Sequence, residues 1–539
     1  MRELMADYQL TIPAIMRRAD AMFGHVAIVS RSADGTVERY SYADMIRRAK
    51  QLAVALQTLG VNPGDRVGTL AWNTPQHMEA YFAVPAIGAV LHTLNLRLHH
   101  DDLTYIVTHA GDRIIIVDQS LLPLLERMTL PPSVEHVVVI REGRDRHDGR
   151  DLPGRAIDYE TLVAGGDGER FAHLDLDERD AAAMCYTSGT TGRPKGVVYS
   201  HRTIALQAMN QTTADALGVC QRDVILAVVP MFHINGWGLP FAAALVGARL
   251  VLPGPSLDPR SLLDLITRER VTMSAGVPTV WLGVLHALDN QSCTGDLSSL
   301  RALAIGGSAV PPALIRAYQE RYGVSVVHAW GMTETTAVAT VCSLPADMDD
   351  APPAAQYAWR SKQGTPLPFV EIRARGDAGL VPWDGLTMGE LEVRGITVAS
   401  AYYDDPGAAD RFTDDHWFRT GDVVTITARG CIELRDRSKD LIRSGGEWIS
   451  SVALENALMG HPAVAEAAVI AVPDPTWDER PLAVVVLKAG EQVSPEELRQ
   501  HLAPDFAKWW LPDRIEFVDA IPRTSTGKFL KTALRERFR

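Results

Sequence analysis

One turn of the chain reads Tyr186-Thr187-Ser188-Gly189-Thr190-Thr191-Gly192-Arg193-Pro194-Lys195-Gly196 and follows an apolar run. Its glycines let backbone N–H groups approach phosphate oxygens, its hydroxyls can reach phosphate or a metal ion, and its two cations offset anionic charge. The pattern differs from the G-x-x-x-x-G-K-[ST] phosphate loop, because Pro194-Lys195-Gly196 stands where Gly-Lys-Ser/Thr is required. A Gly/Ser/Thr stretch alone is most often a flexible turn. This longer pattern instead predicts a loop that binds polyphosphate.

Short β-branched runs alternate with helical patterns on both sides of this loop. A helix is predicted to begin at Ser41, with Asp44 completing a capping box, and to stop at Gly60. Buried strands are predicted at Arg113 to Val117, His136 to Ile140, Val224 to Val229, Met273 to Gly276, Ala302 to Ile305 and Val324 to Trp330. This alternation predicts an α/β fold with largely parallel sheets.

The segment from Val224 to Ala248 has no Asp, Glu, Lys or Arg and is long enough to span a membrane. Its interior contains prolines, glycines, His233 and Asn235, which would break a helix and leave polar groups unpaired in lipid. We therefore predict a strand, a loop and a helix inside a protein core. The N-terminus mixes charges without an apolar stretch, so no signal peptide is predicted.

The last hundred residues have the pattern of a separate small domain that follows the charged cluster Asp436-Arg437-Ser438-Lys439-Asp440. We predict a boundary that divides the chain into residues 1–436 and 437–539. The predicted elements of the second part are a helix at Val452 to Met459, strands near Val464 to Val472 and Ala483 to Leu487, and a helix opening at Ser494.

Composition excludes some classes of function. The 539 residues are 46% hydrophobic and 22% charged, which is typical of a globular chain with more than one domain. The formal net charge of −13 argues against a protein whose main task is to bind nucleic acid. Five cysteines lie far apart with no C-x-x-C pair, which fits neither a disulfide framework nor a zinc site. We expect a cytoplasmic protein whose cysteines are buried small residues.

The stretch TSGTTGRPKG resembles the signature loop of the adenylate-forming superfamily, which includes acyl-CoA synthetases, non-ribosomal peptide adenylation domains and firefly luciferase. Further stretches similar to the family's motifs follow in the same order: Met231-Phe232-His233-Ile234-Asn235-Gly236-Trp237, Gly306-Gly307-Ser308, Trp330-Gly331-Met332-Thr333-Glu334-Thr335, Thr420-Gly421-Asp422, Asp436-Arg437-Ser438-Lys439-Asp440 and Pro522-Arg523-Thr524-Ser525-Thr526-Gly527-Lys528. The closest likeness is to bacterial long-chain or medium-chain fatty acyl-CoA synthetases. It implies a large N-terminal domain with mixed, largely parallel sheets flanked by helices, and a small mobile α+β C-terminal domain.

The resemblance implies a reaction in two steps. A carboxylate attacks the α-phosphate of ATP, pyrophosphate leaves, and the acyl-adenylate then forms a thioester with coenzyme A. Because the first step brings two anions together, the site must neutralise charge in the transition state. The resemblance therefore implies ATP, Mg²⁺, coenzyme A and a fatty acid as the small molecules bound.

Roles for individual residues follow from the same resemblance. Lys528, Lys195, Glu334 and Thr187 are the implied catalytic residues, and Thr187 and Glu334 would hold Mg²⁺. The implied ATP-binding residues are Thr187, Ser188, Gly189, Thr190, Thr191, Gly192, Lys195, Gly306, Gly307, Ser308, Trp330, Gly331, Met332, Thr333, Glu334, Asp422, Arg437 and Lys528. Asp422 would accept the ribose hydroxyls, and Trp330 stands where the family usually has a tyrosine against adenine. Lys528 would contact the α-phosphate and the attacking carboxylate.

The acyl, hinge and thioester roles are also implied only by the resemblance. Substrate binding falls to His233, Trp237, Val277 and Gly306, with Trp237 matching a tryptophan that gates the fatty-acid tunnel. Phe241 and the segment from Val277 to Trp281 fit an acyl pocket, and they fit an ordinary core equally well. Lys439 would be the hinge of the mobile domain. The loop that supports transfer to coenzyme A would contain Arg443, Gly445, Gly446, Glu447 and Trp448.

Other readings stay open at this level. Taken singly, Glu334 is a helix-start residue, His233 a core histidine and Arg437 a surface ion-pair partner. A ligase that loads a carrier protein, or one that acts on an aryl acid, has the same motifs. A phosphoryl-transferring NTPase would use the glycine-rich loop differently and release phosphate. A non-catalytic relative would be expected to lack Lys528 or Glu334, and both are present. We expect no nucleic acid partner, no stable membrane span, transient bilayer contact at most, and, by resemblance, a homodimer.

Overall fold

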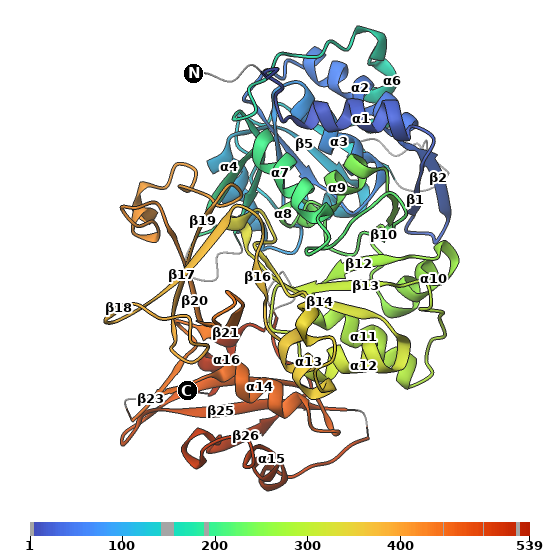
Figure 1. Cartoon of the computed structure of the whole chain (residues 1–539). Coiled ribbons are helices and arrows are strands. Elements are labelled where there is room, and N and C mark those ends of the chain that lie inside the picture. Colours follow the sequence, from blue (N-terminus) through green and yellow to red (C-terminus); the bar gives the residue numbers. More distant parts are fainter. Residues whose placement is uncertain are drawn as a thin grey trace.

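The computed structural model describes residues 5–141, 156–187, 193–445, 447–488, 490–523 and 529–538. Within these residues the N-terminal part contains two large sheets and one smaller sheet, and the C-terminal part contains a fourth sheet (Figure 1). Figure 1 shows β5 with α1, α2 and α3 at the top of the view, β12, β13 and β14 with α11 and α12 at middle height on the right, and the C-terminal domain at the bottom.

The two large sheets are mainly parallel. The seven-stranded sheet has the order β7 (Ala156–Asp158), β6 (His136–Ile140), β5 (Asp112–Asp118), β3 (Arg66–Leu70), β4 (Val90–Thr93), β8 (Ala181–Tyr186) and β9 (Gly196–Ser200), and only β9 is antiparallel. The nine-stranded sheet has the order β16 (Thr365–Pro366), β15 (Thr340–Val341), β14 (Ser325–Trp330), β13 (Ala302–Gly306), β12 (Met273–Gly276), β10 (Val224–Leu226), β11 (Arg249–Leu252), β1 (Ala27–Arg31) and β2 (Val37–Ser41). Its strands from β14 to β1 are parallel. The predicted fold class is confirmed.

The third sheet is antiparallel throughout, which the sequence analysis did not predict. Its order is β18 (Gly379–Leu380), β17 (Val370–Gly376), β19 (Gly389–Gly395), β20 (Phe418–Ile426) and β21 (Ile432–Arg437). The connections between these strands contain no α-helix that could serve as a parallel crossover. The β20–β21 connection is a short turn, whereas residues 396–417 join β19 to β20, and both pairs are antiparallel.

Helices pack against both large sheets. The helices of the N-terminal part are α1 (Ile12–Phe23), α2 (Tyr42–Thr58), α3 (Pro75–Ala86), α4 (His100–Ala110), α5 (Leu122–Leu125), α6 (Tyr159–Gly165), α7 (His201–Thr212), α8 (Ile234–Trp237), α9 (Leu239–Val246), α10 (Pro259–Glu269), α11 (Pro278–Asp289), α12 (Pro312–Tyr322) and α13 (Pro353–Arg360). One apolar core joins residues of α1, α2, α3, α7 and α9 to residues of both sheets. This packing places the ends of β8 and β14 within one domain.

Local sequence signals set the bounds of α2. The Ser41 hydroxyl accepts a hydrogen bond from the backbone N–H of Asp44, and the Asp44 carboxylate accepts one from the N–H of Ser41, so the predicted capping box is present. The helix ends at Thr58, and Gly60 then adopts a φ of +87° that glycine tolerates at no steric cost.

A distant side chain shortens one predicted strand. The strand predicted at Val224 to Val229 is β10, which ends at Leu226. Beyond it, the amide nitrogen of Asn73 donates hydrogen bonds to the carbonyls of Ala227 (2.7 Å) and Val229 (2.9 Å) in place of a neighbouring strand. The charge-free segment continues into α8 and α9, as predicted, and no helix in the described part of the chain is long and apolar enough to cross a membrane.

The C-terminal sheet has the order β23 (Glu447–Ile449), β22 (Ile442–Ser444), β25 (Asp478–Leu487) and β24 (Val464–Asp474), and β26 (Arg514–Phe517) pairs with β25. Its helices are α14 (Ser451–Met459), α15 (Pro495–Leu502) and α16 (Lys531–Phe538). Ser494 caps α15 with Glu497 as predicted. The strand predicted near Ala483 begins earlier, at Asp478, because β24 and β25 form a long hairpin that pairs down to Asp474 and Asp478.

The cysteine expectation is partly wrong. All five cysteines are free, and Cys185, Cys342 and Cys431 are buried, but Cys220 is exposed and Cys293 is half-buried. Both lie outside regular elements, in the segments after α7 and α11, where the chain runs over the surface.

Three buried histidines are expected to make stability depend on pH. Burial lowers the pKa of His77, His201 and His328 to about 4. Between pH 6.5 and 4 the unfolded state binds protons at these rings and the native state does not, so the free energy of unfolding decreases as the pH falls through this window. Chemical unfolding of the wild type and of His328→Gln at pH 7 and pH 5 measures the effect. We expect the variant to lose about 2 kcal/mol less than the wild type; equal losses would contradict this assignment.

Candidate active site

The base of the predicted phosphate loop is a closed hairpin. β8 and β9 pair so that Tyr186 lies opposite Gly196. The backbone N–H of Thr187 donates to the carbonyl of Lys195 (2.9 Å), and the N–H of Lys195 donates to the Thr187 hydroxyl (3.1 Å). The tip residues Ser188, Gly189, Thr190, Thr191 and Gly192 lie outside the described residues, and so does Lys528.

Lys195 connects this hairpin to the segment that follows β19. Its ammonium lies 3.3 Å from the carboxylate of Asp405 and 5.0 Å from the centre of the Tyr402 ring. The Tyr402 hydroxyl donates a 2.6 Å hydrogen bond to Oε1 of Glu334. A cation and a buried carboxylate from distant segments therefore meet through one tyrosine, whose pKa is raised by burial and by the Glu334 charge.

Glu334 is held by a tight turn at the end of β14. The turn is a short 3-10 helix at Thr333–Thr335, and Glu334 is 6% exposed. A Cβ atom at Gly331 would lie 1.6 Å from the carbonyl oxygen of Ala337, so only glycine fits there. The Tyr199 hydroxyl donates to the Thr333 carbonyl (2.7 Å) and fixes the turn against β9.

Trp330, which stands where the family usually has a tyrosine, is hydrogen-bonded to Asp422, the carboxylate predicted to bind the ribose. Nε1 of Trp330 donates a 2.8 Å hydrogen bond to Oδ2 of Asp422, and Nε of Arg437 lies 2.6 Å from Oδ1 of Asp422. Asp422 lies opposite Arg437 in the pairing of β20 with β21 and is 1% exposed. Three predicted residues from separate motifs are thus in direct contact.

The predicted adenine turn lies beside the predicted acyl gate. β13 ends at Gly306, and Gly307 has a φ of +84°. A Cβ atom at Gly306 would lie 2.4 Å from the carbonyl oxygen of Ala329 and 3.5 Å from Cη2 of Trp237. The close approach of the Ala329 carbonyl requires glycine at position 306, and the Trp237 ring lies within van der Waals range of this end of β13.

The backbone around Trp237 is strained. Ile234, Asn235 and Trp237 have φ values of 46°, 50° and 56°, in the left-handed region that costs non-glycine residues roughly 1–2 kcal/mol each. The Asn235 amide oxygen accepts from Cys185 Sγ (3.3 Å) and Thr93 Oγ1 (3.5 Å), which holds this conformation. Such strain concentrates at functional sites. His233 is half-buried and directly precedes the strained turn.

The other predicted acyl-pocket segment, Val277 to Trp281, lies at the start of α11 and not in the turn around Trp237. Val277 is half-buried and caps α11. Trp281 is fully buried in a separate apolar core that includes residues of α10, α11 and α12. For Trp281 the core interpretation therefore holds. Phe241, in contrast, lines a small cavity together with Ile234.

The predicted hinge lies where contacts change from one part of the chain to the other. The N–H of Ser438 donates to the Gly421 carbonyl on β20 (2.9 Å), whereas Arg535 on α16 donates to the Lys439 carbonyl (3.4 Å). Burial lowers the pKa of Lys439, and the nearby Arg437 and Arg535 lower it further. Contacts with the C-terminal part also begin before Lys439, because the N–H and the hydroxyl of Ser451 on α14 donate to Oδ2 of Asp436 (2.6 Å each).

The predicted thiolation loop is the β22–β23 hairpin, with Gly446 outside the described residues. Gly445 has a φ of +62°, and its N–H donates to the Trp477 carbonyl (2.8 Å). The Arg443 guanidinium lies 4.8 Å from the Trp448 ring centre, and Glu447 is exposed beside it. Trp448 is 39% exposed, which leaves an apolar surface free to meet another part of the molecule.

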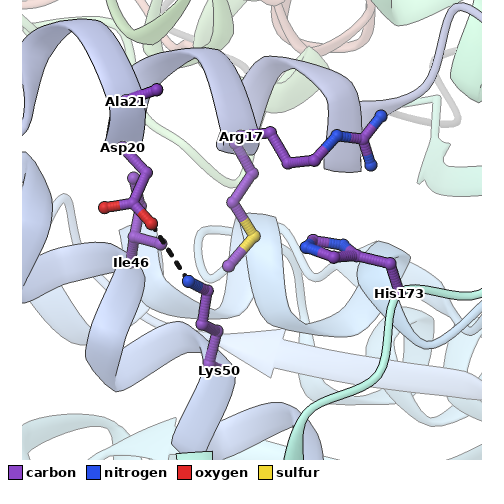
Figure 2. Close-up of a pocket in the computed structure, with 7 residues that line it drawn as sticks. Arg17, Asp20, Ala21, Ile46, Lys50 and His173 are labelled. Carbon is purple, nitrogen blue, oxygen red and sulfur yellow. Dashed lines mark hydrogen bonds and ion pairs between the residues drawn. The ribbon is translucent and has the colours of Figure 1, made fainter. Parts of the chain in front are cut away.

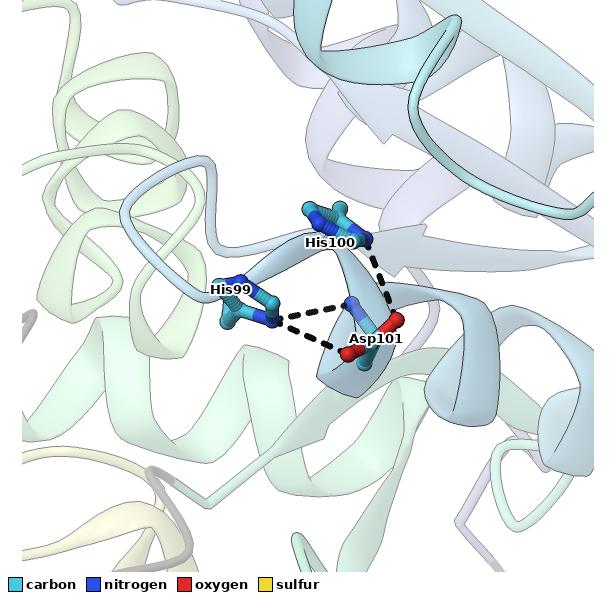
Figure 3. A group of neighbouring side chains, drawn as sticks. All are labelled: His99, His100 and Asp101. Atoms are coloured by element: carbon cyan, nitrogen blue, oxygen red, sulfur yellow. Dashed lines mark hydrogen bonds and ion pairs between the residues drawn. The ribbon is translucent and has the colours of Figure 1, made fainter.

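Two other polar groupings lie apart from these motifs. A cavity of about 350 Å³ lies between α1 and α2. Lys50 pairs with Asp20 there, and Arg17 and His173 line the same space (Figure 2). Figure 3 shows three consecutive residues, His99, His100 and Asp101, at the start of α4. They hydrogen-bond mainly among themselves at a helix start, so we assign no metal site to them.

The comparisons with known proteins agree with this geometry. The model of the family described as AMP-binding enzyme matches residues 16–403, and that of the AMP-binding enzyme C-terminal domain matches residues 453–528. The chain belongs to the AMP-binding enzyme family. This confirms the predicted superfamily.

Relatives and solved structures cover almost the whole chain of this AMP-binding enzyme. It is 46% identical to a long-chain-fatty-acid–CoA ligase of Thermus thermophilus, with 99% of this chain and 97% of the relative aligned. It is 45% identical to a 3-methylmercaptopropionyl-CoA ligase of Ruegeria pomeroyi, with 98% and 97% aligned. A crystal structure of the anthranilate CoA ligase AuaEII with anthranoyl-AMP has a TM-score of 0.87 at 28% identity and covers 98% of both chains.

These findings confirm the predicted activity at the level of reaction type. The AMP-binding enzyme is an AMP-forming acid–CoA ligase that activates a carboxylate with ATP and transfers the acyl group to coenzyme A. Tyr402 and Asp405 are residues of the candidate site that the sequence did not point to, and Tyr402 makes the central contacts. Its only signal was an aromatic pair, Tyr402-Tyr403, before Asp404-Asp405-Pro406, a pattern that is common in surface loops.

Proposed function

We propose that this AMP-binding enzyme is a fatty acid–CoA ligase that acts on long-chain or medium-chain acids. One observation carries the proposal: residues from four separate motifs meet in two contact groups. Tyr402 contacts both Glu334 and Lys195. Asp422 accepts from Trp330 and pairs with Arg437. Relatives named as long-chain and medium-chain fatty-acid–CoA ligases, 46% and 42% identical over almost the whole chain, support the fatty-acid substrate class.

Charge neutralisation is the task we assign to the cations. The carboxylate and the α-phosphate are both anionic, so the attack requires positive charge nearby. We propose that Lys195 serves the phosphates from the hairpin base and that Lys528 serves the α-phosphate and the attacking carboxylate. Asp422 would accept from the ribose hydroxyls, with Trp330 and Arg437 holding its carboxylate. Trp330, Gly306 and Gly307 would bound the adenine.

The residues at the site fit Mg²⁺. Mg²⁺ takes oxygen ligands and is usually bound by one or two protein groups plus substrate phosphates. Glu334 offers a buried carboxylate whose Oε1 already accepts from Tyr402, and Thr187 offers a hydroxyl at the hairpin base. Bound there, Mg²⁺ would supply positive charge to the phosphate oxygens. We propose Glu334 and Thr187 as its protein ligands.

We further propose that one site serves both half-reactions through rotation of residues 437–539 about Lys439. The segment from Asp436 to Lys439 contacts both parts of the chain, which supports a hinge in this segment. The β22–β23 hairpin with Arg443 and Trp448 would then approach the site and support thioester formation. We also propose that the enzyme is a cytoplasmic homodimer; its five free cysteines suit a reducing compartment.

The test is release of pyrophosphate from ATP and Mg²⁺ across fatty acids of increasing length and several aryl acids, with and without coenzyme A. We expect acid-dependent formation of AMP and pyrophosphate that accelerates with coenzyme A and is fastest with fatty acids. A preference for aryl acids would overturn the substrate class. Release of ADP and phosphate, or turnover without an acid, would overturn the ligase itself.

A further inference from the structure

Two glutamines on one face of α7 are buried beside the strained turn. Gln207 and Gln211 are four residues apart, which places them one above the other on a helix. They are 1% and 0% exposed. Gln211 donates a 2.5 Å hydrogen bond to the carbonyl of Trp237, and Gln207 donates a 3.1 Å hydrogen bond to the carbonyl of Val338. Both side chains are therefore oriented by their amide nitrogens.

The amide oxygens of the same two residues are unsatisfied. Among the residues that the structure describes, neither Oε1 of Gln207 nor Oε1 of Gln211 has a hydrogen-bond partner. A buried acceptor without a donor is costly, and native structures contain few of them. Two such oxygens on adjacent turns of one helix indicate a donor that is absent from the chain itself.

Gln207 lines the small cavity that adjoins the predicted gate. The cavity has a volume of about 10 Å³, which is the room for about one water molecule. Its polar walls include the hydroxyls of Tyr199 and Thr336, but these donate to the carbonyls of Thr333 and Thr397. The donor for Gln207 therefore does not come from the hydroxyls around it.

The cavity is too small for an acyl chain, so part of its wall would have to move for one to enter, and the strained turn at residues 234–238 forms part of that wall. Ile234 and Asn235 form part of the cavity wall, and the turn is held by the bond from Gln211 to the Trp237 carbonyl. A chain in this space would lie beside Gln207 on α7, whose amide oxygen has no donor among the described residues. A plain alkyl chain would leave that oxygen without a donor in an apolar environment, at a cost in binding.

We infer that Gln207, with Gln211 beside it, selects acids whose chain carries a hydrogen-bond donor such as a hydroxyl group. This inference rests on the proposed function and narrows its substrate class. A site that hydrogen-bonds a hydroxyl discriminates against the analogue that lacks it, because the polar groups of the site are then left unpaired. Relatives of nearly equal identity act on acids as different as those named for Thermus thermophilus and Ruegeria pomeroyi, so the family framework accommodates such a change.

The experiment compares matched pairs of acids that differ only by one hydroxyl, placed in turn at the middle and at the end of chains of several lengths. The measured quantity is the ratio of kcat/KM for the hydroxy acid to that for the plain acid, from pyrophosphate release with saturating ATP and coenzyme A. For the wild type we expect a ratio of about 10 to 100 at one hydroxyl position. For Gln207→Leu, which keeps the volume and removes the acceptor, we expect a ratio near or below 1.

The ratio of the two kcat/KM values is taken within each variant, so a reduced fraction of folded enzyme lowers both values equally and leaves the ratio unchanged. Gln207→Met serves if Gln207→Leu does not fold, and Gln211→Leu should lower the ratio less, because Gln207 itself lines the cavity. A wild-type ratio of 1 or less at every position, the result expected if a water molecule satisfies Gln207, would overturn the inference while plain acids still release pyrophosphate. If no acid releases pyrophosphate, the proposed function fails instead.

Discussion

Replacing Glu334 by glutamine is expected to lower kcat/KM for acid-dependent pyrophosphate release by about 10²- to 10³-fold. Glutamine keeps the size of the side chain, and its carbonyl oxygen can still accept the hydrogen bond from Tyr402 that Glu334 accepts now. The change therefore removes the negative charge and leaves the packing of the turn intact. Because Mg²⁺ prefers charged carboxylate oxygens, the variant should also require more Mg²⁺ for half-maximal rate.

The matched control for this prediction is Tyr402→Phe. It removes the hydroxyl that donates to Glu334 and keeps the aromatic face over Lys195. We expect a loss of about 10-fold, which corresponds to about 1.5 kcal/mol, the lower end of the range for one hydrogen bond to a charged group. If Tyr402→Phe lowered kcat/KM as much as Glu334→Gln does, loss of the hydrogen bond alone would explain the effect of the Glu334 variant. The metal-ligand role of Glu334 would then be wrong.

Replacing Asp422 by asparagine is expected to raise KM for ATP by about 10- to 100-fold. The Asp422 carboxylate is buried between the Trp330 indole and the Arg437 guanidinium, and it is the group we assign to the ribose hydroxyls. Asparagine can still accept from Trp330, but its charge is gone and Arg437 loses its partner. Initial rates as a function of ATP concentration measure the effect, and a KM within twofold of the wild-type value would contradict the assignment.

Two controls separate binding from stability in the Asp422 variant. Trp330→Phe removes the indole N–H and keeps a flat apolar ring, so we expect a smaller rise in KM for ATP. Removing one partner of a buried ion pair also destabilises proteins, by about 3–5 kcal/mol in fully buried cases. Arg437 is 39% exposed and solvated in part, so we expect a smaller loss here, read from the midpoint of chemical unfolding.

Much of the fold and of the site was predictable because the signals are local. The capping box at Ser41 involves two residues three apart, and β6 and β12 coincide with apolar runs of strand length. The motif around Glu334 is contiguous, so its turn follows from Gly331 and the threonines. The antiparallel sheet of β17–β21 was not predicted, because an alternating pattern of apolar and polar residues indicates a strand without indicating which other strand it pairs with.

The sequence by itself determined the family and the reaction type, and it supplied most residues of the candidate site, since these depend on contiguous motifs whose chemistry is carried by residue type and spacing. Only the tertiary structure decided which of those residues meet. The bond from Trp330 to Asp422 joins positions 92 residues apart, and Tyr402 lies 68 residues from Glu334. Likewise, whether the oxygens of Gln207 and Gln211 find donors depends on every side chain packed around α7. Such long-range contacts arise from packing of the whole chain and leave no periodic trace in its sequence.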